Sequence, residues 1–392
     1  MGNERKPRVL LLATREWVST ARLALALGEL GCEVALVGPR KHPVFEACVL
    51  PGPCCFPEVP VKRSLRRAFR EFQPEAVLAC DEQALKDLLA LSKLDAAVAA
   101  CVRRSFGGDD AAHAAMSRAW MMAQAVEAGV PVPTTVSVES AAELSAVGNE
   151  LGWPLVLKAD ASFGGQGVRV AYSLSEAESA WHRLHQTPGL ARALKRIVVD
   201  HEWSHARARW MRRTNTVSAQ RFIQTEGQEL TTAAVAAKGR LLACTVFEVQ
   251  NVWASLASSS VVRVVENAAV VESMRVLVER FGVSGFVGAD FLPDQQGRMQ
   301  MLEMNFRSTQ LVHLSLGPGR DLCAAFVRGV LGVAVEDRPA ATMLDRVAIF
   351  PQELVRDAQS PEVLGGGAFH DVPRDSPELV RVVAKRFGVS GF

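Results

Sequence analysis

Three oxygen-bearing side chains near residue 300 have the types and spacing of a divalent-metal site. Asp290 lies in one apolar run, and Glu303 and Asn305 lie two residues apart in the next. Residues two apart on a strand point to the same face, and a short antiparallel hairpin would bring Asp290 opposite them. Carboxylate and amide oxygens are the ligands that Mg²⁺ takes together with water and phosphate. A solvated polar strand face is the alternative on these residues alone.

A lysine followed by a glycine-rich loop suggests a phosphate site. Lys158 ends a short aliphatic run, and the loop after it contains Gly164, Gly165 and Gly167. Glycine lets backbone N–H groups approach phosphate oxygens closely, and the lysine adds positive charge at the same strand end. The segment is not a P-loop, because no Gly-Lys-Ser/Thr opens a following helix. A plain hairpin between two strands is the alternative.

The first third of the chain alternates strand and helix patterns. Aliphatic runs at 8–13, 33–37 and 76–80 are typical of strands buried on both faces. A helix predicted over 19–30 gives a βαβ rhythm, which implies a small parallel sheet. The first strand–helix turn, 13–17, has no glycine for the close backbone approach that a dinucleotide pyrophosphate needs, so NAD binding there is not expected.

The remaining elements flank the candidate site residues. One helix is predicted from about 112 to 128, where Gly129 ends it, and another over 267–281. Strands are predicted at 155–158, 168–171, 219–223, 230–236, 241–248, 286–292 and 299–304.

The composition excludes several classes of protein. The chain has 392 residues, enough for two or three domains, and its formal net charge of +2 does not indicate a generic nucleic-acid binder. No apolar run approaches the ~20 residues needed to cross a bilayer, and the start lacks an apolar signal core. The cytoplasm is the expected location, with no nucleic-acid or membrane partner.

Taken together and in this order, the elements resemble the ATP-grasp superfamily over roughly residues 117–333. The most specific part runs from Gly-Ala-Asp-Phe-Leu-Pro-Asp at 288–294 to Leu-Glu-Met-Asn-Phe-Arg at 302–307. The resemblance implies an α/β chain in which two α+β lobes clamp ATP, preceded by a small Rossmann-like parallel-sheet domain. The implied boundaries are 1–107 for the preceding βαβ domain, 108–336 for the ATP-grasp module with its lid lobe at about 135–222, and 337–392 for a C-terminal extension.

The resemblance also implies roles for individual residues. Lys158 and Arg307 would be catalytic, Lys158 at the α-phosphate and Arg307 at the transferred phosphoryl group. Asp290, Glu303 and Asn305 would hold Mg²⁺, for which Mn²⁺ is an expected substitute. The implied ATP-binding set is Arg118, Lys158, Ser162, Gly164, Gly165, Gly167, the adenine hinge Gln220, Arg221, Phe222 and Ile223, and the ribose carboxylate Glu229.

Two positions depart from the superfamily pattern. Arg118 stands where a phosphate-binding lysine is usual; it keeps the charge but presents a planar fork. Gln220 stands where an acidic residue is common, and its amide oxygen can accept from the adenine amino group. Arg263 and His313 are candidates for substrate contact, with a structural role as the alternative for His313.

The implied reaction is ADP-forming ligation. ATP would phosphorylate a carboxylate, and the acyl phosphate would meet an amine to give a peptide-like bond between small molecules. Two alternatives stay open: bicarbonate activation, as in carboxylases and carbamoyl-phosphate synthesis, and a non-catalytic nucleotide-binding module. Two interpretations of the basic segment 203–213 stay open: a docking site for a carrier protein and a solvated helix. A homodimer also stays open.

Overall fold

The computed structural model describes residues 6–50, 61–160, 167–185, 215–253 and 258–390. The chain divides into two compact units. Unit 1 consists of Met1–Ala112, Gln228–Phe291 and Met304–Phe392, and unit 2 consists of His113–Gly227 and Leu292–Glu303. This division follows compactness, so the boundaries expected at 107 and 336 stay predictions. In the described residues no helix has the length and apolarity to span a bilayer.

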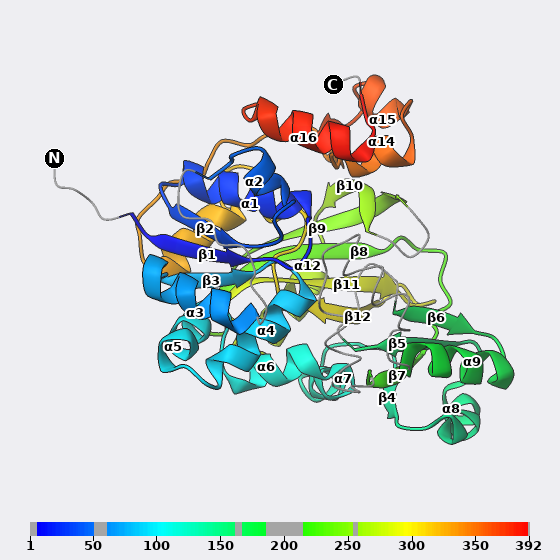
Figure 1. The fold of residues 1–392 in the computed structure, drawn as a ribbon. Coiled ribbons are helices and arrows are strands. Elements are labelled where there is room, and N and C mark those ends of the chain that lie inside the picture. Colours follow the sequence, from blue (N-terminus) through cyan, green and yellow to red (C-terminus); the bar gives the residue numbers. More distant parts are fainter. Residues whose placement is uncertain (1–5, 51–60, 161–166, 186–214, 254–257, 391–392) are drawn as a thin grey trace. The chain divides into compact units, whose positions relative to one another are not determined.

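Unit 1 begins with the small parallel sheet that the sequence predicts. Its strands are β1 (Arg8–Leu12), β2 (Glu33–Val37) and β3 (Ala76–Ala79), in the order β2-β1-β3 (Figure 1). The helices of this region are α1 (Val18–Glu29), α2 (Pro43–Glu46), α3 (Val61–Phe72), α4 (Glu82–Ser92), α5 (Ala96–Ser105) and α6 (Asp109–Met116). Gly31, at φ +81°, follows the end of α1, where a left-handed residue favours glycine. The aliphatic strands are buried from both sides, which confirms the predicted βαβ arrangement.

A larger sheet has the strand order β12-β11-β8-β9-β10-β13-β14. Its strands are β8 (Leu230–Ala237), β9 (Arg240–Val252), β10 (Ser259–Val265), β11 (Gly285–Pro293), β12 (Met299–Asn305), β13 (Arg346–Ala348) and β14 (Phe369–His370). Helix α12 (Ala268–Phe281) packs on β9, and α13 (Leu322–Phe326) packs on β8 and β9. A π-helical turn, Val327–Leu331, continues α13. Phe326 stacks on Phe286 of β11 with ring centroids 5.1 Å apart, so this contact joins α13 to the sheet within the core.

Unit 2 contains a four-stranded sheet in the order β4-β7-β5-β6. Its strands are β4 (Thr135–Val138), β5 (Leu155–Ala159), β6 (Val168–Ala171) and β7 (Val217–Arg221), and its helices are α7 (Arg118–Glu127), α8 (Leu144–Leu151) and α9 (Leu174–His185). A 3₁₀ turn, Ala141–Glu143, precedes α8. Leu157 and Ala219 point to the helix-covered face and are buried with Trp181 and Leu184. Side chains alternate across a strand, so the opposite face is left for polar residues.

The single helix predicted over 112–128 is wrong in one respect. The structure has two helices there, α6 and α7, separated at Ser117. The Ser117 hydroxyl accepts a hydrogen bond from the backbone N–H of Trp120 at 3.4 Å, so it caps the start of α7. As a result Arg118 is the first residue of a helix.

The C-terminal segment belongs to the larger sheet. Strand β13 pairs antiparallel with β10 and parallel with β14. Three helices accompany it: α14 (Gln352–Arg356), α15 (Pro361–Leu364) and α16 (Pro377–Phe387). Glu353 of α14 is fully buried and accepts hydrogen bonds from Ser260 of β10 at 2.7 Å and from Ser360 at 2.6 Å. Arg356 completes its charge pairing at 2.5 Å. This carboxylate therefore fastens the segment to the sheet.

Replacing Glu353 with glutamine is expected to destabilise the protein by about 3 kcal/mol at neutral pH. The substitution removes the buried negative charge that pairs with Arg356. Burial raises the pKa of Glu353, but hydrogen bonds from Arg356, Ser360 and Ser260 outweigh it and leave that pKa below its usual value. A glutamate whose pKa is lower in the folded protein stabilises the fold at pH values above its unfolded pKa of about 4.3. This contribution to the free energy of unfolding disappears as the pH falls through the pKa of the folded protein. Urea unfolding at pH 7 and at pH 4 measures this: the gap between wild type and Glu353→Gln should narrow at pH 4. A constant gap would contradict it.

Candidate active site

One face of the four-stranded sheet in unit 2 carries polar side chains in register. Lys158 of β5 lies opposite Ser218 of β7, and Gln220 of β7 lies opposite Thr135 of β4. Directly opposed residues share a face. Lys158, Ser218 and Gln220 are all buried, so this face holds desolvated donors rather than solvated surface groups.

Lys158 and Gln220 converge on one backbone carbonyl. The Lys158 ammonium donates to the carbonyl oxygen of Leu302 at 3.3 Å, and the Gln220 amide donates to the same oxygen at 3.4 Å. Gln220 also donates to the Thr135 hydroxyl at 3.0 Å. The Lys158 side chain is only 6% exposed. An ammonium in such a setting interacts more strongly with a phosphate oxygen than one in bulk water.

Arg118 adds a second cation within unit 2. Its guanidinium donates to Glu303 Oε2 at 2.8 Å, and its Nε lies 3.8 Å from Asp160 Oδ1. The side chain is 11% exposed. Because Arg118 is the first residue of α7, its charge adds to the positive end of the helix dipole. Arg118 therefore neutralises a predicted metal ligand in this structure, and a metal ion would compete with it for Glu303.

The glycine-rich loop is closed at its base. The backbone N–H of Ala159 donates to the carbonyl oxygen of Gly167 at 2.8 Å, which continues the pairing of β5 with β6. Ser162, Gly164 and Gly165 lie outside the described residues. Phosphate contacts by this loop stay a prediction.

The predicted adenine hinge follows the polar face. Strand β7 ends at Arg221, whose N–H donates to the carbonyl oxygen of Thr134 at 2.9 Å. Phe222 is 37% exposed and Ile223 is half-buried. Glu229, which belongs to unit 1, is half-buried just before β8. Base and ribose recognition by these residues stay predictions.

In unit 1, Asp290 and Asn305 are within hydrogen-bonding distance. Asn305 Nδ2 donates to Asp290 Oδ2 at 3.4 Å, and the Thr231 hydroxyl donates to Asp290 Oδ1 at 2.7 Å. Asp290 and Thr231 are opposite each other on β11 and β8. Glu303 is two residues before Asn305 on β12. No group of three or more His, Cys, Asp or Glu suited to a metal occurs in the described part of the chain, so the predicted set depends on the Asn305 amide.

Arg307 contacts the end of the small parallel sheet. Its Nε donates to Glu82 Oε1 at 2.6 Å, and its guanidinium lies 5.4 Å from the ring centroid of Trp17. Sequence reasoning singled out neither Glu82 nor Trp17. The available signal was the polar pair Asp81-Glu82 directly after a buried strand, since ligands of α/β sheets gather at the carboxyl ends of strands.

Comparisons with known proteins show which families and folds the chain resembles. The model of the family described as carbamoyl-phosphate synthase L chain, ATP-binding domain, matches residues 117–208. No curated protein matches the chain in sequence. An N5-carboxyaminoimidazole synthase from Aspergillus clavatus, solved with ADP and 5-aminoimidazole ribonucleotide, superposes with a TM-score of 0.61 at 16% identity, covering 85% of this chain and 80% of that one.

Two further solved structures have the same architecture. The biotin carboxylase domain dimer of a Hydrogenobacter thermophilus 2-oxoglutarate carboxylase, solved with MgADP, ADP and bicarbonate, gives a TM-score of 0.60 at 14% identity, covering 86% of this chain and 72% of that one. An L-amino acid ligase from Bacillus licheniformis gives 0.53 at 14% identity, covering 84% and 75%. The chain has the ATP-grasp fold.

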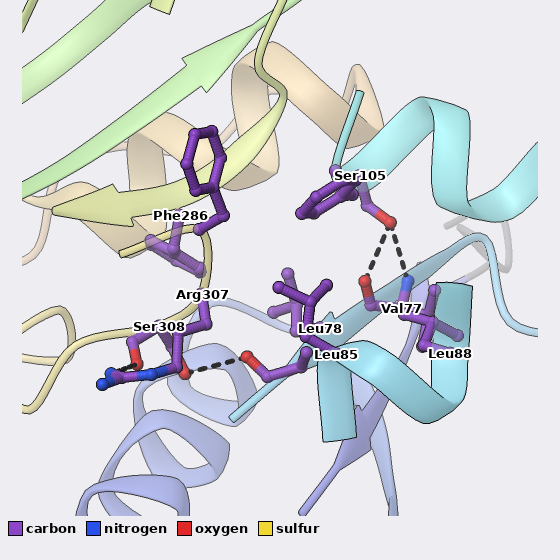
Figure 2. Close-up of a pocket in the computed structure, with 11 residues that line it drawn as sticks. Val77, Leu78, Leu85, Leu88, Ser105, Phe286, Arg307 and Ser308 are labelled. Carbon is purple, nitrogen blue, oxygen red and sulfur yellow. Dashed lines mark hydrogen bonds between the residues drawn. The ribbon is translucent and has the colours of Figure 1, made fainter. Parts of the chain in front are cut away.

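A small pocket of the ATP-grasp chain lies in unit 1 beside Arg307 (Figure 2). Its lining is mostly apolar: Val77, Leu78, Ala79, Leu85, Leu88, Ser105, Phe106, Phe286, Phe306, Arg307 and Ser308. Ser105 bonds the backbone of Val77, and the Arg307 guanidinium points away from Leu85 and Leu88 in Figure 2. The pocket offers little to a charged substrate, and we assign it to packing between β3 and the following helices.

The two predicted substrate contacts lie elsewhere in unit 1. Arg263 is in register with Glu248, which is in register with Leu230 and through it with Phe291. Phe291 is the neighbour of Asp290, so Arg263 is on the opposite face of the sheet from Asp290. It pairs there with Glu248 at 2.9 Å. This placement favours a structural pair, and substrate contact by Arg263 stays a prediction without support from the geometry.

His313 is 5% exposed and bonds Asp371 at 2.9 Å. Burial lowers the pKa of His313, although Asp371 beside it acts in the opposite direction. Arg22 of α1 also pairs with Asp371. The histidine therefore takes part in a buried network that ties the C-terminal segment to the first helix, as its structural alternative expects. Its contact with substrate stays untested.

Proposed function

We propose that the chain is an ADP-forming ligase that activates a carboxylate with ATP and joins it to an amine. The observation that carries the proposal is the polar sheet face of unit 2, where Lys158 and Gln220 share the Leu302 carbonyl. A buried ammonium and a buried amide on that face supply the charge and the hydrogen-bond donors that suit a nucleotide. The solved relative with ADP and the L-amino acid ligase support the same chemistry by fold.

The nucleotide would use residues from the whole predicted set. Lys158 would contact the α-phosphate, Arg118 the outer phosphates, and Ser162, Gly164, Gly165 and Gly167 would cover them. Gln220, Arg221, Phe222 and Ile223 would recognise adenine, and Glu229 would accept from ribose hydroxyls. Electrostatic stabilisation of the phosphates by placed donors is then the main source of catalysis.

Asp290, Glu303 and Asn305 fit Mg²⁺ by donor chemistry, since all three supply hard oxygen atoms. The Asp290 carboxylate is already oriented by Thr231 and Asn305, which would limit its loss of freedom on binding. A divalent ion at these residues would neutralise charge on the phosphate oxygens. Mn²⁺ is an expected substitute because it accepts the same ligands.

The reaction needs no protein nucleophile. A carboxylate oxygen of the substrate attacks the γ-phosphorus, ADP leaves, and the acyl phosphate forms. The amine then attacks the acyl carbon, inorganic phosphate leaves, and the amide loses a proton to solvent. Arg307 would hold the transferred phosphoryl group through its fork of N–H donors.

Bicarbonate activation is the second candidate, and a specific observation favours it. The similar biotin carboxylase domain was solved with bicarbonate as well as MgADP. In that case bicarbonate would take the place of the organic carboxylate, with the phosphates held by the same residues. The domain is a dimer, so we include a homodimer in the proposal, measurable by light scattering.

Release of ADP by the purified chain with Mg-ATP separates the candidates. One panel pairs each standard amino acid with every other, a second adds simple mono- and dicarboxylic acids to amines, and a third contains bicarbonate alone. We expect ADP release that requires both a carboxylate and an amine, with the amide detected by mass spectrometry. Stimulation by bicarbonate alone would favour the second candidate. Tight binding of Mg-ADP without turnover in any panel would instead indicate a nucleotide-binding module.

A further inference from the structure

At the carboxyl edge of the small parallel sheet, the hydrogen bonds of one side chain join the ends of two strands. Strands β1 and β3 are parallel neighbours, so their carboxyl ends lie at the same edge of the sheet. Asp81 follows β3 and accepts from the backbone N–H of Thr14 at 2.6 Å and from the Thr14 hydroxyl at 2.7 Å. It also accepts from the N–H of Ala84 at 2.8 Å, as the cap of α4. Asp81 thus fastens the two strand ends to each other.

Glu82 differs sharply from its neighbour Asp81. Both Asp81 oxygens are used inside the fold. Glu82 Oε1 receives Arg307, whereas Glu82 Oε2 is buried and has no hydrogen-bond partner among the described residues. A buried carboxylate oxygen without a donor is costly. Glu82, the first residue of α4, thus directs its carboxylate to Arg307 and not to the strand ends that Asp81 joins.

Three contacts fix the Arg307 side chain: the edge of its guanidinium contacts Glu82, the guanidinium packs on the ring of Trp17, and one N–H donates to the backbone of Ser308. Nε and Nη2 both contact Glu82 Oε1, at 2.6 Å and 2.5 Å, and Nη1 donates to the carbonyl oxygen of Ser308 at 3.1 Å. Trp17 lies against the guanidinium at 5.4 Å, a cation–π distance. Ser308 itself donates from its backbone N–H to the carbonyl oxygen of Ala79 at 3.3 Å. The Arg307 side chain is only 14% exposed.

We propose that Glu82 and Trp17 are positioning residues, which fix the plane of the Arg307 guanidinium before substrate arrives. The inference rests on the proposed function, because it takes Arg307 as the group that meets the phosphoryl oxygens. A free arginine side chain has many rotamers, and ordering it in advance removes that entropy cost from the chemical step. The sheet edge fastened by Asp81 thus acts on the reaction through Arg307.

The test is steady-state ADP release by Glu82→Gln with the substrates that wild type uses. Glutamine keeps the size and an acceptor oxygen but removes the charge that orients the guanidinium. We expect kcat to fall roughly 10- to 100-fold, the scale for misplacing a catalytic group. The KM for ATP and the Kd for Mg-ADP should stay within about three-fold of wild type, because the substitution leaves the residues that bind the nucleotide unchanged. Glu362→Gln, at another partly buried pair 3.1 Å from Arg346, is the matched control and should leave kcat unchanged.

A double-mutant cycle with Arg307→Lys separates positioning from general damage. If Glu82 acts through Arg307, adding Glu82→Gln to Arg307→Lys should lower kcat by less than about two-fold, because coupled residues are not additive. Additive losses, or wild-type kcat in Glu82→Gln, would overturn the inference while leaving the proposed function intact. If Glu82→Gln fails to fold, Trp17→Leu carries the test, with an expected fall in kcat of about 5-fold for a lost cation–π contact and no change in Kd for Mg-ADP. An unaltered kcat in Trp17→Leu would equally overturn it. Absence of any ADP release by wild type would instead count against the proposed function.

Discussion

Replacing Lys158 with methionine is expected to lower kcat/KM for ATP by roughly 10²- to 10³-fold, the loss typical of removing one placed electrostatic donor. Methionine keeps the length and the apolar stem of lysine, which suits a side chain that is 6% exposed. It removes the ammonium that now donates to the Leu302 carbonyl. That oxygen keeps the Gln220 amide as a donor. The loss should therefore fall on the phosphates and only weakly on folding.

The measurement pairs ADP release with the Kd for ADP and with thermal unfolding. Lys93→Met is the matched control, because Lys93 is exposed at the end of α4 and should retain full activity. A Tm of Lys158→Met within a few degrees of wild type would show that the fold survives. Lys158→Met with wild-type kcat/KM and an unchanged Kd would remove Lys158 from the nucleotide site.

The elements of the fold were predictable where each strand carries its own pattern. The continuous aliphatic runs of β1, β2 and β3 indicated a parallel sheet, because only strands covered on both faces need no polar positions. In unit 2 the short aliphatic runs at 155–158 and 168–171 indicated two strands, which the structure has as β5 and β6. Such information is local, so a single sequence contains it.

The ends of the helices were harder to predict than the strands. Ser19 was expected to begin the first helix, whereas α1 starts at Val18 after Trp17, which makes no side-chain cap. At Ser117 the apolar spacing runs through the break between α6 and α7, so periodicity alone could not reveal it. Serine is tolerated within helices and favoured at their starts, and the choice between these depends on tertiary packing.

Contacts within the site were harder to predict the further apart their residues lie in the sequence. Asn305 and Asp290, 15 residues apart, were paired correctly because a hairpin and a period of two decide their positions. Arg307 and Glu82 are 225 residues apart, and no local pattern links them. The pairing of Arg118 with Glu303 across 185 residues was likewise not foreseen. Contacts of this kind are set by the packing of whole elements, which a single sequence does not encode in any readable spacing.

Replacing Asp290 with asparagine is expected to lower ADP release by at least about 10²-fold and to raise the Mg²⁺ concentration needed for half-maximal rate, because a neutral amide is a weaker ligand for a hard cation. Asparagine can still accept from Thr231 and stay near Asn305, so the strands keep their pairing. Glu303→Gln should behave similarly in metal dependence, but it also removes the 2.8 Å partner of Arg118. The nucleotide affinity of Glu303→Gln should therefore change for two reasons: the metal ligand is weaker, and Arg118 loses its charged partner.

Metal binding can be followed without turnover. Calorimetry of Mn²⁺ added to the chain with ADP should show weaker binding for Asp290→Asn than for wild type, and Asp110→Asn, whose carboxylate pairs with Arg280 on the surface, is the matched control. Because Arg118 neutralises Glu303 in this structure, metal binding has to compete with a resident cation, and Arg118→Met should tighten Mn²⁺ binding even as it weakens the hold on phosphate. Opposite effects of one substitution on metal and nucleotide would be hard to obtain unless Glu303 serves both. Equal Mn²⁺ affinity in wild type and Asp290→Asn would place the ion elsewhere.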